Sequence, residues 1–252
     1  MTALATSVLV LLREGAEISW LSNTRQIILS SLPIKTKIHL RKENDMEYTK
    51  IPNIFMRDPK TKKIIEGKYA SETLEYLKNC EWEFTEKVDG TNIRVEWDGY
   101  RVEFKGRTDK AQIPKHLLEK LESLFGGELN EEIFEQTFRK KHVILFGEGY
   151  GEKIQKGGEL YGPVDFIMFD VWVDGVWLKR DSMLKIAEKF GVKTVPVVGR
   201  GTLDKAVDFV ASQPISSLKA DVMEGVVGKP ATGVLDRIGE RIIVKIKCRD
   251  FV

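Results

Sequence analysis

The pattern of hydrophobic and polar positions changes near Met46. Before it, short apolar runs at residues 7–12 and 26–32 alternate with isolated charges, and no period persists long enough to predict a helix or a strand. From Met46 onward the pattern is regular. We therefore expect residues 1–45 to be an N-terminal extension, either poorly ordered and outside the core or packed on the domain as a small addition. Residues 46–252 are expected to form the folded domain.

Within the regular part, the alternation of apolar and polar residues predicts two β-hairpins. Residues 92–97 and 100–104 flank Asp98-Gly99, and residues 169–173 and 176–178 flank Asp174-Gly175. Asp-Gly between alternating segments is the strongest short-range hairpin signal. Further strands are expected near residues 143–147, 193–198, 223–228 and 241–247, and Pro196 restricts the second of these to a sheet edge.

The 3.6-residue period predicts helices between these strands. The expected ranges are residues 71–79, capped by Ser71, and residues 114–125, 131–141, 182–190 and 203–211. Antiparallel hairpins mixed with helices indicate an α+β domain with antiparallel sheets flanked by helices, rather than a doubly wound parallel sheet.

Composition and charge exclude several classes of protein. With 40 basic and 38 acidic residues the net charge is +2, which excludes a strongly cationic arm or an acidic tail but leaves room for a local basic groove. No apolar run approaches the ~20 residues that span a membrane, and no secretory signal is expected. Cys80 and Cys248 form no CxxC pair, and the three histidines lack the spacing of metal ligands; they are His39, His116 and His142. We expect a soluble protein of the reducing cytoplasm.

Candidate chemistry begins at Lys87-Val88-Asp89-Gly90. A lysine two residues before Asp-Gly, at the start of a strand, places Lys87 and Asp89 on one face, and Gly90 lets a ligand approach the backbone closely. Alone, this KxDG string is as well explained by a charged strand edge before a hairpin, since it occurs by chance in roughly one chain in fifteen to twenty. Neither a P-loop nor a GxGxxG loop is present in the glycine-containing segments at residues 147–151 and 225–230.

The tetrad resembles the adenylate-accepting motif of the covalent nucleotidyltransferases, the superfamily of DNA ligases, RNA ligases and mRNA capping enzymes. Five further motifs resemble those of the superfamily and follow in its order: Lys105-Gly106-Arg107, Phe146-Gly147-Glu148-Gly149, Phe166-Ile167-Met168-Phe169-Asp170, Glu224-Gly225-Val226-Val227-Gly228-Lys229 and Lys245-Ile246-Lys247. Singly, most of them would be solvated strand faces or core aromatics, but the ordered series is not coincidence. The resemblance implies an α+β nucleotidyltransferase domain, the ATP-grasp-like adenylation domain of ligases.

The resemblance also implies roles for the motif residues. Lys87 would be the nucleophile that becomes joined to AMP, with Lys245 and Lys247 as further catalytic residues that neutralise the α-phosphate. The implied nucleotide-binding residues are Glu86, Asp89, Gly90, Asn92, Arg107, Glu148, Phe169, Glu224 and Lys229. ATP is the implied cofactor, and Glu224 would lie near Mg²⁺. Strand alternation places Phe169 on the face of Ile167 and opposite Asp170, and its position before Asp170 favours it over Phe166 as the residue that stacks on the purine.

A nucleophilic lysine must be neutral, although its reference pKa is about 10.4. Crowding of Lys87 by Lys245, Lys247 and a divalent metal is the expected means of lowering that pKa. These three lysines are expected to converge on one cleft with Lys105, Arg107 and Lys229.

Within the superfamily the chain is most similar to the nick-sealing RNA ligases of the RNA ligase 2 family. The likeness rests on Thr91-Asn92, on Ile154-Gln155-Lys156 and on residues 195–201, whereas Asp89 stands where that family often has His. It implies an ATP-dependent ligase that joins 3′-hydroxyl and 5′-phosphate RNA ends as a monomer, acting on RNA or a nicked RNA-containing duplex and not on a membrane. A minimal ATP-dependent DNA ligase and a non-catalytic end-binding module are the alternatives. Because the sequence stops five residues after Lys247, no C-terminal OB-fold is expected and capping is disfavoured.

Overall fold

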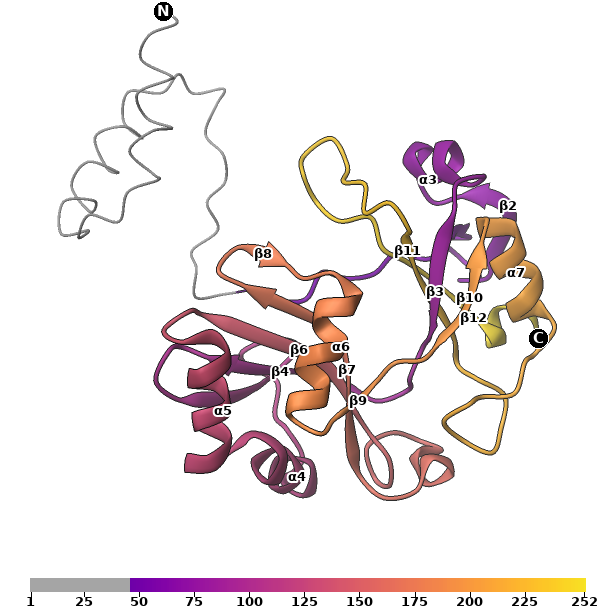
Figure 1. Ribbon diagram of the computed structural model, residues 1–252. Helices are drawn as coiled ribbons and strands as arrows, with labels where there is room; N and C mark the ends of the chain where they lie inside the picture. Colours follow the sequence, from indigo (N-terminus) through magenta and orange to yellow (C-terminus); the bar gives the residue numbers. More distant parts are fainter. Residues whose placement is uncertain (1–45) are drawn as a thin grey trace, which may run out of the picture. The chain divides into compact units, whose positions relative to one another are not determined.

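Two β-sheets form the framework of residues 46–252, the part of the chain that the computed structural model describes (Figure 1). The expectation for residues 1–45 lies outside the described residues. One sheet has the strand order β5-β4-β6-β7-β8, with the short β9 beside β7, and the other has the order β10-β3-β11-β12. A two-stranded ribbon, β1-β2, forms no strand pair with either sheet. We call the two larger sheets the six-stranded and the four-stranded sheet.

The strand bounds are β1 (Phe55–Arg57), β2 (Ile64–Tyr69), β3 (Trp82–Glu86), β4 (Thr91–Trp97), β5 (Val102–Gly106), β6 (Val143–Tyr150), β7 (Asp165–Val173), β8 (Val176–Trp177), β9 (Lys193–Thr194), β10 (Val197–Gly201), β11 (Gly225–Pro230) and β12 (Val244–Lys247). The helices are α3 (Glu72–Leu77), α4 (Lys115–Phe125), α5 (Glu128–Phe138), α6 (Arg180–Lys189) and α7 (Leu203–Ala211), with 3₁₀ turns η2 (Gly158–Tyr161) and η3 (Cys248–Phe251). Among the described strands, β9 with β7 is the one parallel pair. The expected α+β class with antiparallel sheets is confirmed.

Each sheet has its own apolar core. Helices α4, α5 and α6 pack on the six-stranded sheet, where residues such as Leu117, Phe134 and Ile186 meet Ile93 and Val95. Helices α3 and α7 pack with the four-stranded sheet and the β1-β2 ribbon around Trp82, Leu203 and Ile246. None of the described helices is long and apolar enough to cross a bilayer. A third, smaller cluster of Val88, Tyr150, Ile167 and Val195 lies where the chain passes between the sheets.

Both predicted hairpins are present, but one of the two turns is longer than predicted. Asp174 and Gly175 form a two-residue turn with φ of 45° and 90° between β7 and β8. The turn at Asp98 is longer, because its carboxylate accepts hydrogen bonds from the backbone N–H groups of Tyr100 and Arg101 at 2.8 and 2.9 Å. Strand β5 was predicted to begin at residue 100, but it therefore begins at Val102.

The predicted helices are also confirmed, with shifts at their ends. Ser71 caps α3 by accepting a hydrogen bond from the N–H of Leu74 at 3.3 Å. Helix α5 starts at Glu128 and ends at Phe138, so the predicted range of 131–141 was placed too late. It stops because Arg139 takes a φ of 56°, which no helical residue adopts.

Two connections carry the chain between the sheets, and the sequence analysis had assigned both segments to strands. The segment predicted as one strand at 193–198 is divided at Pro196, because proline cannot donate to a ladder; β9 joins the six-stranded sheet and β10 forms an edge of the four-stranded sheet. The other connection is residues 87–90 between β3 and β4. Lys87 and Asp89 were expected on one face of a strand, but they lie in this connection.

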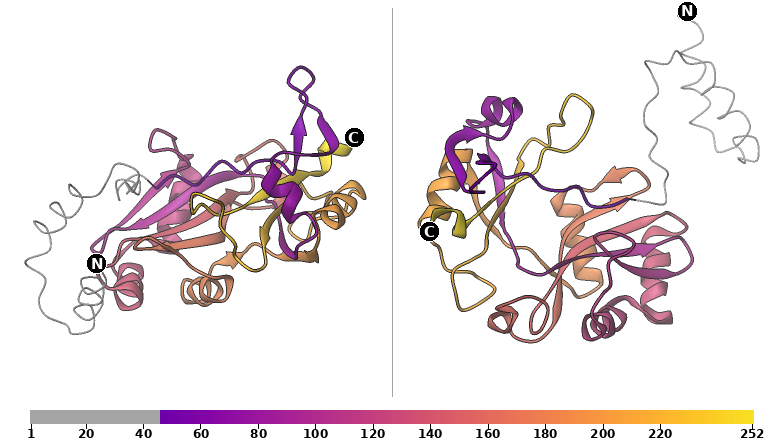
Figure 2. Two further views of the ribbon diagram at one scale, coloured as in Figure 1. Left: turned by 90° about the horizontal axis from the view of Figure 1, so that it is seen from above. Right: turned by 180° about the vertical axis from the view of Figure 1, so that it is seen from behind.

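A third segment also spans the two sheets. Residues 46–54 run from the six-stranded to the four-stranded sheet (Figure 2, right). At one end Tyr48 packs on Phe146 and Phe169, with ring centroids 5.1 and 5.0 Å apart. At the other end the N–H of Ile54 donates to the carbonyl of Lys245 at 3.0 Å.

Candidate nucleotide-binding site

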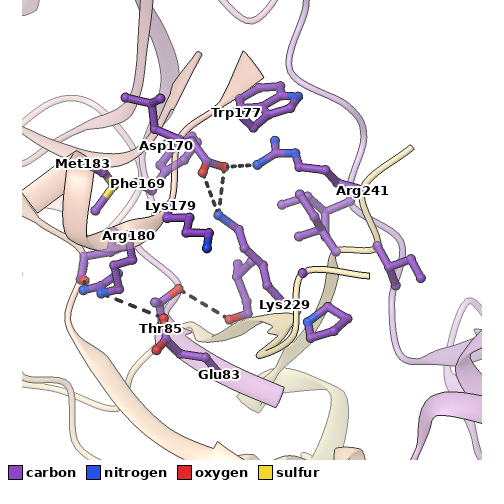
Figure 3. A pocket seen from close by; sticks show the side chains of 18 of the residues that line it. Glu83, Thr85, Phe169, Asp170, Trp177, Lys179, Arg180, Met183, Lys229 and Arg241 are labelled. Carbon is purple, nitrogen blue, oxygen red and sulfur yellow. Dashed lines mark hydrogen bonds and ion pairs between the residues drawn. The ribbon is translucent and has the colours of Figure 1, made fainter. Parts of the chain in front are cut away.

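A cavity of about 930 Å³ lies between residues of the two sheets. Its lining includes Lys87, Asn92 and Glu148 at one end and Asp170 and Arg241 at the other. Figure 3 shows the second group, with Lys229 reaching from β11 toward Asp170. We call these regions the Lys87 end and the Asp170 end of the cavity. The volume is in the range of natural small-molecule sites.

At the Lys87 end, two lysines share one carboxylate. The Nζ of Lys87 donates to Oε2 of Glu224 at 2.6 Å, and the Nζ of Lys247 donates to Oε1 of the same residue. The backbone N–H of Lys87 also donates to the carbonyl of Gly225 at 2.9 Å. The first and last of the six motifs are thereby joined through the fifth.

Lys245 completes this basic group on β12. Burial lowers the pKa of its ammonium, and the neighbouring charges of Lys87, Lys247 and Arg107 lower it further. Arg107 itself is exposed directly after β5. The like-charge crowding that the sequence predicted is therefore present, and it acts on Lys245, while Lys87 is held by a carboxylate. Lys105 was expected in the same cleft, but its Nζ is engaged 2.5 Å from Oε2 of Glu96.

Glu148 and Asn92 face each other across β6 and β4, where they are register partners. Burial raises the pKa of the Glu148 carboxyl to about 8. The positive charges of Lys87 and Lys247 oppose this effect, and the negative charges of Glu224 and Asp89 add to it. The buried Oδ1 of Asn92 has no hydrogen-bond partner among the described residues. The Glu148 carboxyl and the unpaired Oδ1 of Asn92 are thus on neighbouring residues, an arrangement that suits a ligand with hydroxyl groups.

Gly90 and Asp89 are fixed by close neighbours. A Cβ atom at Gly90 would lie 2.2 Å from the carbonyl oxygen of Gly149, so only glycine fits. The N–H of Asp89 donates to the hydroxyl of Tyr161 at 3.2 Å. The connection between the sheets is therefore held in place on the C-terminal side of Lys87.

Glu86 is held differently from what its predicted role suggests. Its carboxylate is buried and accepts hydrogen bonds from the hydroxyl of Ser216 and from both the N–H and the hydroxyl of Ser217, the last two at 3.1 and 2.7 Å. These bonds tie β3 to the segment that leads into Glu224. The Glu86 side chain therefore helps to fix the position of Glu224.

The carboxylates of this end fit a hard divalent cation in their chemistry. Glu224, Glu148 and Asp89 interact electrostatically, and an added cation would favour the ionised form of Glu148. Within residues 46–252 no preformed cluster of three or more His, Cys, Asp or Glu residues could hold a metal alone. Such a site suits Mg²⁺, which keeps several waters and is usually completed by phosphate oxygens.

At the Asp170 end, a β-bulge corrects the predicted orientation of β7. Phe146 pairs with Asp170 while Gly147 pairs with Met168, so Phe169 is an extra residue without a partner. The bulge interrupts the alternation, and Phe169 and Asp170 both line the cavity. The sequence analysis placed them on opposite faces because alternation alone cannot reveal an inserted residue.

The Asp170 carboxylate is surrounded by donors. Lys229 Nζ lies 2.9 and 2.8 Å from its two oxygens, Arg241 Nη1 lies 3.0 Å from Oδ2, and the Tyr48 hydroxyl donates to Oδ2 at 2.6 Å. The two cations lower the pKa of Asp170 against the opposing effect of burial. Since Asp170 belongs to the six-stranded sheet and Lys229 to the four-stranded sheet, this ion pair crosses the cavity.

The motif order and the site geometry agree with the comparison to known families. The RNA ligase family model matches residues 80–247, more than half of the chain. This chain belongs to the RNA ligase family. All six motifs of the sequence analysis lie within the matched range.

Solved structures share the fold of this RNA ligase family member. The Naegleria gruberi RNA ligase with PPi is 20% identical, with a TM-score of 0.55 over 86% of this chain and 61% of that one. A mutant of the same ligase with AMP and Mn is also 20% identical, with a TM-score of 0.54 over 70% of this chain and 52% of that one. The present chain therefore corresponds to little more than half the length of those ligases. It has no significant match among curated proteins.

Three residues that line the cavity escaped the sequence analysis. Tyr48, Trp177 and Arg241 lie outside all six motifs, yet they line the cavity. Tyr48 and Arg241 contact Asp170, and Trp177 stacks on Arg241. Trp177 closes a predicted hairpin, and the other two lie in irregular segments. No periodicity or spacing links them, because only the tertiary fold brings them together.

Proposed function

We propose that this chain is an ATP-dependent RNA ligase that acts through a lysyl-AMP intermediate on Lys87. The observation that carries the proposal is the junction of Lys87, Glu224 and Lys247 beside the cavity. A neutral Lys87 Nζ would form a P–N bond to the α-phosphorus of ATP, and the bond from that phosphorus to pyrophosphate would break. Membership of the RNA ligase family supports this reaction.

Each neighbour of Lys87 has a task in that reaction. Lys245 and Lys247 lie two residues apart on β12 and can neutralise the charge that develops on the α-phosphate. Asn92 and Glu148 can bind the ribose hydroxyls, and Asp89 and Gly90 hold the connection that carries Lys87. A Mg²⁺ ion held near Glu224 would supply neutralisation of the phosphate oxygens.

The base of ATP would occupy the space between Phe169 and the four-stranded sheet. Phe169 can stack on the purine, because the β7 bulge turns it into the cavity. Lys229 donates toward the same space from β11, and Glu86 fixes the segment before Glu224. Exposed Arg107 is free to meet the 5′-phosphate of the acceptor end.

In the second half of the reaction, AMP would pass to a 5′-phosphate and a 3′-hydroxyl would then displace it. The proposed substrate is RNA, including nicks in RNA-containing duplexes, and the proposed form is a cytoplasmic monomer. Cys80 and Cys248 are both free thiols, which fits a reducing compartment.

The test is covalent labelling with ATP that carries ³²P in the α-phosphate, with Mg²⁺ present. The wild-type chain should retain the label through denaturing electrophoresis. Lys87→Ala and Lys87→Arg should retain none, because guanidinium does not deprotonate in proteins. Lys68→Ala, which changes an exposed lysine of β2, should label like the wild type. An unlabelled wild type would refute the proposal.

A second assay then identifies the nucleic acid. Nicked duplexes with RNA or with DNA on the 3′-hydroxyl side are offered separately to the labelled enzyme. Sealing that is faster with RNA supports an RNA ligase, and sealing that is faster with DNA contradicts it.

A further inference from the structure

Arg241 belongs to none of the six motifs, yet at the Asp170 end it contacts both Trp177 and Asp170. Its guanidinium carbon lies 3.3 Å from the ring centroid of Trp177, while Nη1 lies 3.0 Å from Oδ2 of Asp170. The side chain is only 20% exposed. Figure 3 shows the guanidinium next to the indole, with a dashed line to the Asp170 carboxylate. A planar cation is therefore held by stacking and by an ion pair together.

The two partners of Arg241 belong to a different sheet from its own segment. Trp177 ends β8 and Asp170 lies in β7, whereas Arg241 lies in the loop of residues 231–243 that connects β11 to β12. That loop doubles back on itself through a bridge between Leu235 and Arg241. Arg241 thus anchors a loop of the four-stranded side to the six-stranded sheet.

The loop covers part of the cavity. Gly233, Val234 and Leu235 line it, although Val234 and Leu235 remain 39% and 55% exposed. A loop with so much exposed apolar surface gains little from its own packing. Its position over the cavity therefore depends on anchoring contacts such as those of Arg241.

We propose that Arg241 and Trp177 form a latch that holds the 231–243 loop over the Asp170 end of the cavity and thereby sets the affinity for ATP. The inference rests on the proposed function, since it takes the ligand to be ATP. Arg241 is a positioning residue, because it acts through the loop and through Asp170.

The latch should act on binding and leave the chemical step unchanged. Without Arg241, the Asp170 carboxylate still has Lys229 and Tyr48 as donors, so the wall that carries Phe169 stays in place. Lys87 and its partner Glu224 make no contact with Arg241. Loss of the latch therefore frees the loop, while the reacting groups remain as they were.

The experiment measures lysyl-AMP formation in single turnovers over a range of ATP concentrations, and calorimetric binding of α,β-methylene ATP, which cannot be cleaved at that bond. Arg241→Ala should raise the KM for ATP and the Kd of the analogue about tenfold, with the maximal rate within about twofold of wild type. Arg241→Lys keeps the charge but loses the planar stack, and should fall between the two. Trp177→Leu should resemble Arg241→Lys.

The matched control is Arg237→Ala, which removes an exposed arginine from the same loop and should leave both constants unchanged. Equal constants in Arg241→Ala and wild type would overturn the latch, as would a lower maximal rate with an unchanged KM. If Arg241→Ala fails to fold, Arg241→Lys and Trp177→Leu decide by the same criteria. A wild type that binds the analogue but forms no lysyl-AMP refutes the ligase and not the latch; one that does neither refutes both.

Discussion

Each end of the cavity is organised around one carboxylate, and the two carboxylates have opposite surroundings. Glu224 lies among Lys87, Lys245 and Lys247, which repel one another and lower the pKa of Lys245. Asp170 accepts hydrogen bonds from Lys229, Arg241 and Tyr48 and is packed among aromatic rings. The lysines at the Lys87 end crowd each other. At the Asp170 end, Lys229 and Arg241 reach the carboxylate from different segments, and Arg241 also stacks on Trp177.

The difference separates reactivity from architecture. Crowded ammonium groups near one carboxylate can be rearranged by a phosphate or a cation, which is what a nucleophilic lysine requires. A carboxylate saturated by three donors from different segments gains nothing from rearrangement and fixes the wall of the cavity. We infer that the Lys87 end determines the rate and the Asp170 end determines stability and affinity.

The largest expected effect is the loss of stability in Asp170→Asn. The substitution leaves Lys229 and Arg241 without their shared negative partner, and breaking a buried pair in this way costs about 3 kcal/mol or more. For a domain of this size the melting temperature should fall by roughly 2–4 °C for each kcal/mol. Thermal unfolding measures the change. Asp208→Asn, on the exposed side of α7, should stay within about 0.5 kcal/mol of wild type, and an equally small effect of Asp170→Asn would remove the proposed distinction between the ends.

Glu224→Gln is expected to affect the rate and to leave stability almost unchanged. Glu224 accepts from two lysines and from no buried hydroxyl like that of Tyr48, and a Gln amide oxygen can still accept a hydrogen bond from one of the two lysines. Loss of one preorganised electrostatic group typically slows catalysis about 100-fold. Single-turnover adenylation should show this drop, while Glu188→Gln on the exposed face of α6 should not. If Glu224→Gln instead unfolds the protein and spares the rate, the two ends have been assigned the wrong way round.

The sequence predicted what is local and missed what depends on packing. The Asp174-Gly175 turn and the Ser71 cap were predictable, because each is formed by neighbours in the chain. The bulge at Phe169 was not, since one extra residue in a strand leaves no trace in a pattern of period two. The displacement of Lys87 from the strand into a connection was missed for a similar reason: the pattern does not show where one sheet ends and another begins.

The two ends of the site differ in the same way. The motif residues Lys87, Glu224 and Lys247 could be chosen from the sequence because they belong to a series of motifs with a fixed order. Tyr48 and Arg241 belong to no motif, and their common partner Asp170 brings them together only in the folded chain. Residues that only the tertiary fold brings to a site are thus harder to predict than residues of an ordered motif series.

A change in pH from 6.5 to 7.5 should alter the stability contribution of Glu148 at the Lys87 end and leave that of Asp170 unchanged. The pKa of Glu148 is raised from 4.5 to about 8, so the folded state binds a proton more tightly than the unfolded state. Stability from this group is complete below about pH 4.5 and falls as pH rises toward 8. Asp170 has a lowered pKa, so its contribution is lost only at acid pH.

The free energy of unfolding should accordingly fall by up to about 1.4 kcal/mol between pH 6.5 and pH 7.5 in metal-free buffer. Urea unfolding at the two values measures it. Glu148→Gln should remove most of the difference, and Glu132→Gln, on α5, should retain it. A wild type whose stability is constant over this interval would show that Glu148 is ionised throughout.

The smallest effect is expected for Tyr48→Phe, which separates the hydrogen bond of Tyr48 from its packing. The substitution removes the hydroxyl that donates to Asp170 at 2.6 Å, while the ring can keep its contacts with Phe146 and Phe169. Because Asp170 retains Lys229 and Arg241, the cost should be about 1 kcal/mol in urea unfolding. Tyr76→Phe, at a position that is 86% exposed, should cost nothing measurable. A loss in Tyr48→Phe as large as that in Asp170→Asn would mean that the three donors act as one unit and not as separate supports.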